Sequence, residues 1–249
     1  MKNYYEKELL VTATYTDRRC EMGAFHAALL IQDGMTEFFS QYQCDAIRMS
    51  QTHGAVWAVA RTKIHYDGEI FWMDRVRLKV FPVKISSVAV HLNILVESLD
   101  GRPLLRARQE LCAIDVADHS LRRIETTPFP KELEPLPPVF TEPYQRIKLK
   151  LDEDHLAYRY QVRTMDTDMN GHINNTHYIR LILDACPSSF WDARRITDFD
   201  IHYVNEGVEG EELGFYCLEE EDALAVQVKR GETTLVKAFF SLQARTHSS

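Results

Sequence analysis

The segment from Arg163 to Tyr178 gathers several side chains that could transfer protons or form hydrogen bonds. Within it, a carboxylate, an amide and an imidazole occupy alternate positions as Asp168, Asn170 and His172. A mainly apolar run begins shortly afterwards, which predicts the start of a helix. Because a helix start carries unpaired backbone N–H groups and the positive end of the dipole, it can stabilise negative charge. The segment could therefore combine acid–base catalysis with stabilisation of an oxyanion by amides near residues 172–174.

The same segment has simpler interpretations. Asp, Asn and Gly in succession are typical of a turn or a helix cap, and Asn174 or Asn175 is expected to cap the helix in either case. The run from Asp166 to Gly171 imitates the first half of a calcium loop, but His177 stands where such a loop requires Glu. The histidines and carboxylates here do not have the spacing of an established zinc site. We therefore predict neither a metal nor a cofactor.

The composition is that of an ordinary globular protein and argues against several classes of function. The 249 residues carry a net charge of −8, which disfavours nucleic acid as the main partner. The five cysteines are scattered and form no C-x-x-C pair, which indicates reduced thiols rather than a disulfide framework. No apolar run approaches the roughly 20 residues needed to span a bilayer, and the first residues resemble neither a signal nor a transit peptide. We expect a cytoplasmic protein.

A proline-rich segment separates two halves that repeat the same order of predicted elements. Six of the nine prolines lie between Pro128 and Pro143, which is typical of an extended linker. Before it, a strand precedes a helix at about residues 23–41, and four strand patterns follow. After it, a strand precedes a helix at about residues 174–191, and four more follow. We predict an N-terminal domain at 1–126, a linker at 127–145 and a C-terminal domain at 146–249.

Both predicted helices are apolar around most of their surface. In the second, the polar residues His177, Arg180 and Asp184 share one narrow stripe, so the rest of the helix must be covered by other structure. The strand patterns alternate with period two, as in residues 88–97, and give each sheet one apolar face. These patterns predict an α+β fold in which a sheet wraps around a central helix, present twice.

This arrangement resembles the tandem, or double, hotdog fold. The run from Asp168 to Tyr178 resembles the signature of acyl-[acyl-carrier-protein] thioesterases, and three shorter stretches are similar to that family in the same order along the chain: Val56–Arg61, Asp100–Arg108 and Tyr203–Glu206. The resemblance covers nearly the whole sequence. It implies hydrolysis of the thioester that joins a fatty acyl chain to the phosphopantetheine arm of acyl carrier protein.

The resemblance also implies a catalytic group of four residues, Asp168, Asn170, His172 and Glu206. One position departs from the family pattern, because plant members commonly carry Cys directly after the Glu, whereas this chain has Gly207. A cysteine nucleophile is thereby excluded at this site. Water activated by a carboxylate or imidazole, or direct attack by Asp168, is favoured instead. The sequence leaves open which carboxylate acts in which way.

The resemblance assigns the hydrophobic tunnel for the acyl chain to the N-terminal half. Candidates for its walls are Trp57, Phe25, Leu29, Leu30 and Met35, although for any one of them ordinary core is the favoured interpretation. Arg75 and Arg77 alternate along one strand face and are candidates for docking an acidic carrier protein. The simpler interpretation of these two arginines is a solvated sheet face.

Two alternatives to this function are an acyl-CoA thioesterase on the same scaffold and a non-catalytic hotdog module that binds acyl thioesters. The polar cluster argues against the second, because binding alone does not require it. A bacterial cytoplasmic enzyme fits the sequence better than a plastid precursor. A homodimer is compatible with the sequence, although two hotdog halves in one chain could satisfy each other's sheet edges.

Overall fold

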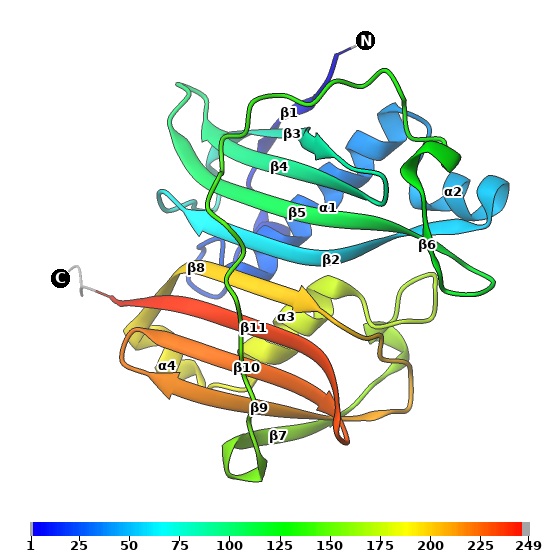
Figure 1. Cartoon of the computed structure of the whole chain (residues 1–249). Helices are drawn as coiled ribbons and strands as arrows, with labels where there is room; N and C mark the ends of the chain where they lie inside the picture. Colours follow the sequence, from blue (N-terminus) through cyan, green and yellow to red (C-terminus); the bar gives the residue numbers. More distant parts are fainter. Residues whose placement is uncertain (1, 246–249) are drawn as a thin grey trace. The chain divides into compact units, whose positions relative to one another are not determined.

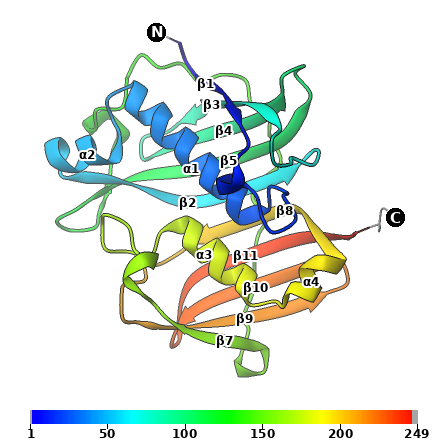
Figure 2. The same cartoon turned by 180° about the vertical axis from the view of Figure 1, so that it is seen from behind.

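The computed structural model describes residues 2–245 of the chain, which forms two compact units. Unit 1 is Met1–Pro143 and unit 2 is Tyr144–Ser249. Each unit contains an antiparallel sheet with a helix lying along one face (Figures 1 and 2). The predicted α+β class, with the same sheet-and-helix arrangement present twice, is confirmed.

Unit 1 is built on five principal strands and a short additional one. In spatial order the principal strands are β1 (Tyr5–Leu10), β3 (Arg75–Ile85), β4 (Ala89–Ser98), β5 (Pro103–Asp115) and β2 (Ala55–Tyr66). The short strand β6 (Leu121–Arg122) pairs with β5. The helical elements of this unit are α1 (Ala24–Gln41), α2 (Ala46–His53) and the short turns η1 (Ala13–Tyr15) and η2 (Ile124–Thr126).

Helix α1 packs on this sheet because its apolar residues recur at helical spacing. Five of them are at most 2% exposed: Ala27, Leu30, Ile31, Phe38 and Phe39. A Cβ added at Gly34 would lie only 2.6 Å from Cδ2 of Leu78 on β3. The missing side chain at Gly34 therefore allows the helix to approach the sheet closely.

Unit 2 repeats the plan with a shorter central helix. Its strands are, in spatial order, β8 (Arg194–Tyr203), β11 (Thr233–Ala244), β10 (Ala223–Arg230), β9 (Glu212–Glu220) and β7 (Leu156–Gln161). Its helical elements are η3 (Glu153–His155), η4 (Thr164–Asp166), α3 (Asn175–Asp184) and α4 (Ser188–Ala193). The side chains of Ile179 and Ile182 on α3 are at most 1% exposed, so the apolar face of the helix is covered as the sequence predicted.

The second predicted helix is divided in two, which corrects the single helix expected at about residues 174–191. α3 ends at Asp184, and Pro187 is the N-cap of α4. Proline has no N–H to donate and disfavours helical geometry in the residue before it, so the helix stops there. The indole N–H of Trp191 donates to the carbonyl oxygen of Leu183 at 2.9 Å, which ties α4 to the end of α3.

The proline-rich segment packs against the units, on the sheet face away from α1 and α3 (Figures 1 and 2). In unit 1, Oδ1 of the fully buried Asn93 accepts hydrogen bonds from the N–H groups of Val139 at 2.9 Å and Phe140 at 3.1 Å. In unit 2, the carboxylate of Asp200 accepts from the N–H of Gln145 at 2.5 Å. Buried polar side chains need partners, and an extended segment supplies unpaired N–H groups. Compact unit 1 consequently ends at residue 143, whereas we predicted a domain end at 126 and a linker over 127–145.

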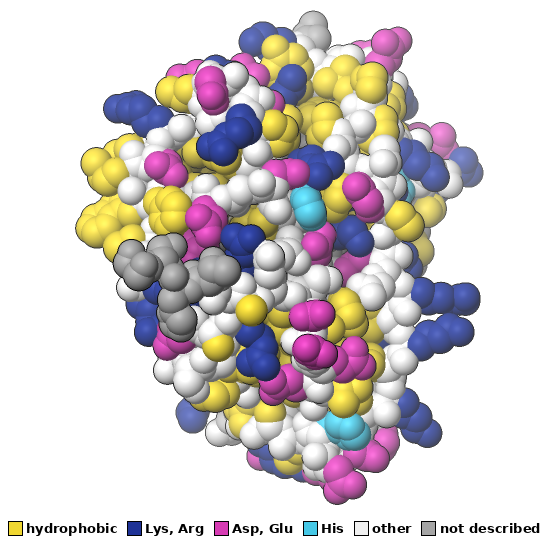
Figure 3. All heavy atoms as spheres, turned by 90° about the vertical axis from the view of Figure 1, so that its left-hand side faces the viewer, with side chains coloured by type: hydrophobic (Ala, Val, Ile, Leu, Met, Phe, Trp, Pro, Cys, Tyr) yellow, Lys and Arg dark blue, Asp and Glu magenta, His cyan; other side chains and the backbone are white. Residues whose placement is uncertain are grey.

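The surface carries both signs of charge. Lys and Arg side chains are interspersed with Asp, Glu and hydrophobic side chains over the face shown in Figure 3. On this face, therefore, the acidic side chains behind the net charge of −8 are mixed with basic ones and do not form a uniformly acidic surface. Across residues 2–245, none of the helices has the length and apolar character that crossing a membrane requires.

Candidate active site

The loop between η4 and α3 carries three of the predicted site residues, and backbone hydrogen bonds close it into a tight turn. The N–H of Asp168 donates to the carbonyl oxygen of His172 at 2.8 Å. The N–H of Gly171 donates to the carbonyl oxygen of Asp168 at 3.0 Å. Gly171 has a φ of 78°, a conformation that glycine adopts without steric cost. Asp168 and His172 are therefore held at the base of one turn.

The segment after β8 is hydrogen-bonded to this loop. The N–H of Ile173 donates to the carbonyl oxygen of Gly207 at 2.9 Å, and His172 and Val208 form an isolated β-bridge. This pairing places Nε2 of His172 3.2 Å from Oε2 of Glu206. The imidazole is 26% exposed and the carboxylate 52% exposed, so water can reach the pair. An imidazole–carboxylate pair in contact with water can accept and pass on a proton.

Asp168 and Asn170 lie on the same turn, but the carboxylate of Asp168 is engaged within it. Oδ1 of Asp168 accepts a hydrogen bond from the backbone N–H of Asn170 at 2.8 Å, as an Asx turn does. Asn170 is exposed. Of the four predicted catalytic residues, the structure thus brings His172 and Glu206 into direct contact and holds Asp168 and Asn170 on the neighbouring turn.

The start of α3 is capped as predicted. Oδ1 of Asn174 accepts from the N–H of Thr176 at 2.9 Å and from its hydroxyl at 2.8 Å. Two of the amides expected to serve an oxyanion already have acceptors, because the N–H of Ile173 donates to the carbonyl oxygen of Gly207 and the N–H of Asn174 donates to that of Asp166. The helix start is therefore used for folding the loop, and an oxyanion would need another donor.

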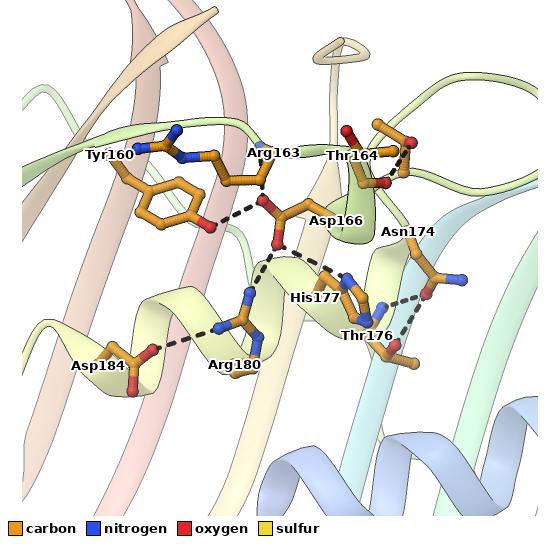
Figure 4. A network of polar contacts seen from close by, with 10 residues as sticks. Tyr160, Arg163, Thr164, Asp166, Asn174, Thr176, His177, Arg180 and Asp184 are labelled. Carbon is orange, nitrogen blue, oxygen red and sulfur yellow. Dashed lines mark hydrogen bonds and ion pairs between the residues drawn. The ribbon is translucent and has the colours of Figure 1, made fainter. Parts of the chain in front are cut away.

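Asp166, a buried carboxylate at the end of η4 that was not among the predicted site residues, connects β7 and α3 next to this loop (Figure 4). Its side chain is 3% exposed and accepts from the hydroxyl of Tyr160 at 2.8 Å, from the backbone N–H of Arg163 at 2.8 Å and from Nη2 of Arg180 at 2.6 Å. A charge removed from water requires such partners. The signal available in the sequence was the polar stripe on α3, because a stripe that includes Arg180 on a covered helix must meet a partner of opposite charge.

His177 borders the same network on α3. Its Nδ1 lies 3.8 Å from Oδ1 of Asp166. Burial lowers the pKa of His177, and the nearby Arg180 lowers it further, while Asp166 opposes both effects. His177 is therefore an uncharged helix residue near neutral pH rather than part of the His172–Glu206 pair.

The residues predicted to bind the acyl chain belong to unit 1. Trp57 stacks on Phe39 with ring centroids 4.7 Å apart, and its indole N–H donates to the carbonyl oxygen of Cys44 at 2.8 Å. The other predicted tunnel residues of α1 are Phe25, Leu29 and Met35, which are half-buried, and Leu30, which is buried. Trp57 thus has a packing role within unit 1, and a tunnel stays a prediction.

The two arginines predicted for carrier docking differ in their surroundings. Arg77 on β3 pairs with Glu8 on the neighbouring strand β1, with Nη2 and Oε1 2.9 Å apart. Arg75, two residues earlier on the same strand, is exposed. Because an exposed ion pair weakens the attraction that Arg77 can exert on an acidic partner, Arg75 is the stronger docking candidate.

Comparison with known proteins assigns both units to thioesterase families. Residues 11–142 match the model of the thioesterase-like superfamily, and residues 149–238 match that of the acyl-ACP thioesterase C-terminal domain. Chloroplastic palmitoyl-acyl carrier protein thioesterases of Cuphea hookeriana and Gossypium hirsutum are each 24% identical over 159 residues. Those matches cover 61% of this chain and 38% of each relative, so the chain spans well under half the length of these relatives.

Solved structures share the fold over nearly the entire chain. An acyl-ACP thioesterase from Bacteroides thetaiotaomicron superposes with a TM-score of 0.83 at 19% identity and covers 97% of this chain and 98% of its own. A 12:0-ACP thioesterase from Umbellularia californica gives 0.81 at 14% identity and covers 98% and 99%. The predicted double hotdog fold is confirmed by these likenesses.

Proposed function

Because the chain belongs to the thioesterase-like superfamily and its C-terminal unit to the acyl-ACP thioesterase C-terminal domain family, we propose that it hydrolyses fatty acyl thioesters of acyl carrier protein. The observation that carries the proposal is the 3.2 Å contact between His172 and Glu206 beside the turn that bears Asp168. The names of the plant relatives support acyl carrier protein as the partner. The products are a free fatty acid and the phosphopantetheine thiol.

In the proposed reaction, water attacks the carbonyl carbon of the thioester. The imidazole of His172 accepts a proton from this water, while Glu206 orients the ring and stabilises its charged form. The carbon–sulfur bond then breaks, the fatty acid is released, and the thiolate leaves. The proton held by His172 passes to that thiolate, which returns the site to its starting state.

The two turn residues have supporting roles in this proposal. The exposed amide of Asn170 donates a hydrogen bond to the substrate carbonyl, because the N–H groups of Ile173 and Asn174 already have acceptors. Asp168 holds the turn through the N–H of Asn170. Direct attack by Asp168 on the thioester is the competing mechanism, and it would make the carboxylate of this residue indispensable.

The proposal is tested by the release of free thiol from acyl carrier protein loaded with acyl chains of graded length. The wild-type protein is expected to turn over, and His172→Ala and Asp168→Asn should each lower kcat without a large change in Tm, the former by about 100-fold or more. His155 offers a matched control, because it also pairs with a carboxylate in unit 2, with Nδ1 2.7 Å from Oδ1 of Asp152. His155→Ala should retain wild-type turnover. Near wild-type rates in both site variants would refute the site.

The carrier is tested by offering the same acyl chains on coenzyme A. A higher kcat/KM with acyl carrier protein supports the proposal. A higher kcat/KM with coenzyme A would make the protein an acyl-CoA thioesterase instead. Binding of acyl thioesters without thiol release from either carrier would identify a non-catalytic module.

We include a reducing, cytoplasmic location in the proposal. All five cysteines fall within the described residues and are free thiols. Burial raises the pKa of Cys186 to about 11 and that of Cys44 to about 12, so both stay protonated near neutral pH. Fractionation of cells that express the protein, followed by thiol counting, tests the location.

A further inference from the structure

Tyr178 is a buried tyrosine that the proposed reaction does not use. It lies in the first turn of α3 and is 2% exposed. Its hydroxyl is buried beside the backbone of Gly207, which acts on it as a hydrogen-bonding group without reaching ordinary hydrogen-bond geometry. Burial also raises the pKa of this hydroxyl, so it is un-ionised at physiological pH. A buried polar group without a well-formed hydrogen bond is unusual and calls for a reason.

The hydroxyl of Tyr178 faces Gly207, the residue that follows Glu206. A Cβ added at Gly207 would lie 2.7 Å from this hydroxyl oxygen and 2.9 Å from Cδ1 of Ile173. Both distances are shorter than the contacts that a Cβ atom makes in proteins, so a side chain at position 207 would displace its surroundings. The hydroxyl thus occupies the space that a side chain at 207 would need.

The backbone around Glu206 and Gly207 is held from other sides as well. The carbonyl oxygen of Gly207 accepts from the N–H of Ile173 at 2.9 Å, and that of Glu206 accepts from Nη1 of Arg230 at 3.5 Å. Tyr178 therefore adds a third contact to a backbone segment, residues 206–207, that Ile173 and Arg230 already hold by hydrogen bonds. Displacing Gly207 would move Glu206, because the two residues share a peptide bond.

We propose that the close contact between the hydroxyl of Tyr178 and Gly207, called the steric lock below, fixes the distance between Glu206 and His172. This makes Tyr178 a positioning residue. This inference rests on the proposed function. It also explains why position 207 holds glycine, since the hydroxyl leaves no room there for a cysteine. A misplacement of about 1 Å in a catalytic group can cost about 100-fold in rate, so a small shift of Glu206 has a measurable effect.

Three variants test the lock: Gly207→Ala, Tyr178→Phe and the double variant. Gly207→Ala should lower kcat by about tenfold or more and leave KM within about twofold, because the chemical step depends on Glu206 and substrate binding does not. The double variant should recover to within about threefold of the wild type, because loss of the hydroxyl removes the 2.7 Å contact. The remaining close contacts are with the terminal methyl groups of Ile173 at 2.9 Å and Leu235 at 3.3 Å, which can rotate away.

Gly214→Ala is the matched control for overpacking. Gly214 lies on β9 in the same unit and also faces a tyrosine, with its added Cβ 2.6 Å from Cε2 of Tyr216. This variant should lower Tm through strain and leave kcat at the wild-type value. A fall in kcat at Gly214→Ala equal to that at Gly207→Ala would overturn the lock, because the effect would then be general.

Two other results would also overturn the lock: wild-type kcat in Gly207→Ala, or a double variant as slow as Gly207→Ala. Where Gly207→Ala does not fold, Tyr178→Phe decides, with a fall in kcat of about threefold at unchanged KM expected and a wild-type kcat contradicting the proposal. Where the wild type releases no thiol from any acyl thioester, the proposed function fails, and crystal structures of the wild type and Gly207→Ala decide about the lock. A longer distance between His172 and Glu206 in the variant supports it, and an unchanged distance overturns it.

Discussion

The two units use the carboxylate at the end of an equivalent strand in different ways. Both β2 and β8 end in the sequence Ile-His-Tyr, at residues 64–66 and 201–203. In unit 1 the next residue, Asp67, accepts two hydrogen bonds from Arg106, at 2.8 Å from Nε and 2.7 Å from Nη2. In unit 2 the carboxylate comes three residues after the strand, as Glu206, and contacts His172. In unit 1 the acid is thus held by a guanidinium, with Nε2 of His65 3.5 Å away, whereas in unit 2 the more exposed acid pairs with the imidazole of His172.

The central helices of the two units, by comparison, are alike at one shared position. His26 is the third residue of α1 and His177 is the third residue of α3. Burial lowers the pKa of both, so the two imidazoles are alike and structural. The difference between the units therefore lies in the loop before the helix, because the polar turn that carries His172 belongs to unit 2. The chain carries two similar scaffolds, and we infer that catalysis depends on the loops of one.

Exchanging the two carboxylates for amides should separate their roles most clearly. Glu206→Gln should lower kcat by about 10²–10⁴-fold with little change in Tm, because the general base His172 loses the carboxylate that orients its ring and stabilises its charged form. Asp67→Asn should leave kcat unchanged and lower the stability of unit 1 by about 1–3 kcal/mol, because two charge-assisted hydrogen bonds are weakened. Steady-state kinetics and thermal unfolding of both variants measure this. A loss of kcat in Asp67→Asn matching that in Glu206→Gln would break the contrast.

The sequence was informative where function depends on neighbours along the chain. The alternation of Asp168, Asn170 and His172 located the loop, and Asn174 or Asn175 was expected as the helix cap. Both inferences use local rules, since turns and caps are set by residues within a few positions of each other. The repeat of strand, helix and strands also gave the α+β class, because hydrophobic periodicity records which face of each element is buried.

The features that the sequence did not reveal depend on contacts between segments that are distant along the chain. Glu206 was selected through family resemblance alone, because 34 positions separate it from His172 and the backbone pairing of Ile173 with Gly207 brings them together. In the sequence, Asp166 stands out only as the start of a run that imitates half of a calcium loop, and its partners Tyr160 and Arg180 become evident in the structure. Local patterns do not encode such distances, so neither the buried network nor the lock at Gly207 could be predicted.

The buried carboxylate of unit 2 should matter more for stability than its counterpart in the loop before α1. Asp166→Ala would leave Arg180, Tyr160 and a backbone N–H without their acceptor, so we expect a loss of about 3–5 kcal/mol, accompanied by a lower kcat. Asp17, whose side chain is 22% exposed, accepts from the N–H groups of Arg19 at 2.8 Å and Glu21 at 3.2 Å. Asp17→Ala should cost about 1 kcal/mol and leave kcat unchanged. Denaturant unfolding compares the two, and equal losses would contradict the difference in burial.

The two helix histidines should give both units a similar sensitivity to acid. Their pKa values in the folded protein lie below the ordinary value of about 6.5, so the unfolded chain binds protons first as pH falls. The stability that the two uncharged histidines contribute is therefore fully present above about pH 6.5 and decreases as the pH falls below that value. Asp17 opposes the shift at His26, and Asp166 opposes it at His177, where Arg180 adds to it. The Tm decrease between pH 7 and pH 5 should shrink in both His26→Gln and His177→Gln, and a decrease unchanged from the wild type would refute the burial argument.

The smallest expected effect tests whether unit 1 contributes to recognition while unit 2 carries the chemistry. Arg75→Glu should raise KM for carrier-bound substrate by about threefold and leave KM for a small acyl thioester unchanged, because steering by one exposed charge acts on an acidic partner alone. Arg77→Glu should show a similar or smaller change, since Arg77 is already paired with Glu8. Arg146→Glu, an exposed charge reversal in unit 2, is the control for net charge. Equal changes for both substrates, or the same increase at Arg146, would mean that the basic strand of unit 1 is an ordinary solvated face.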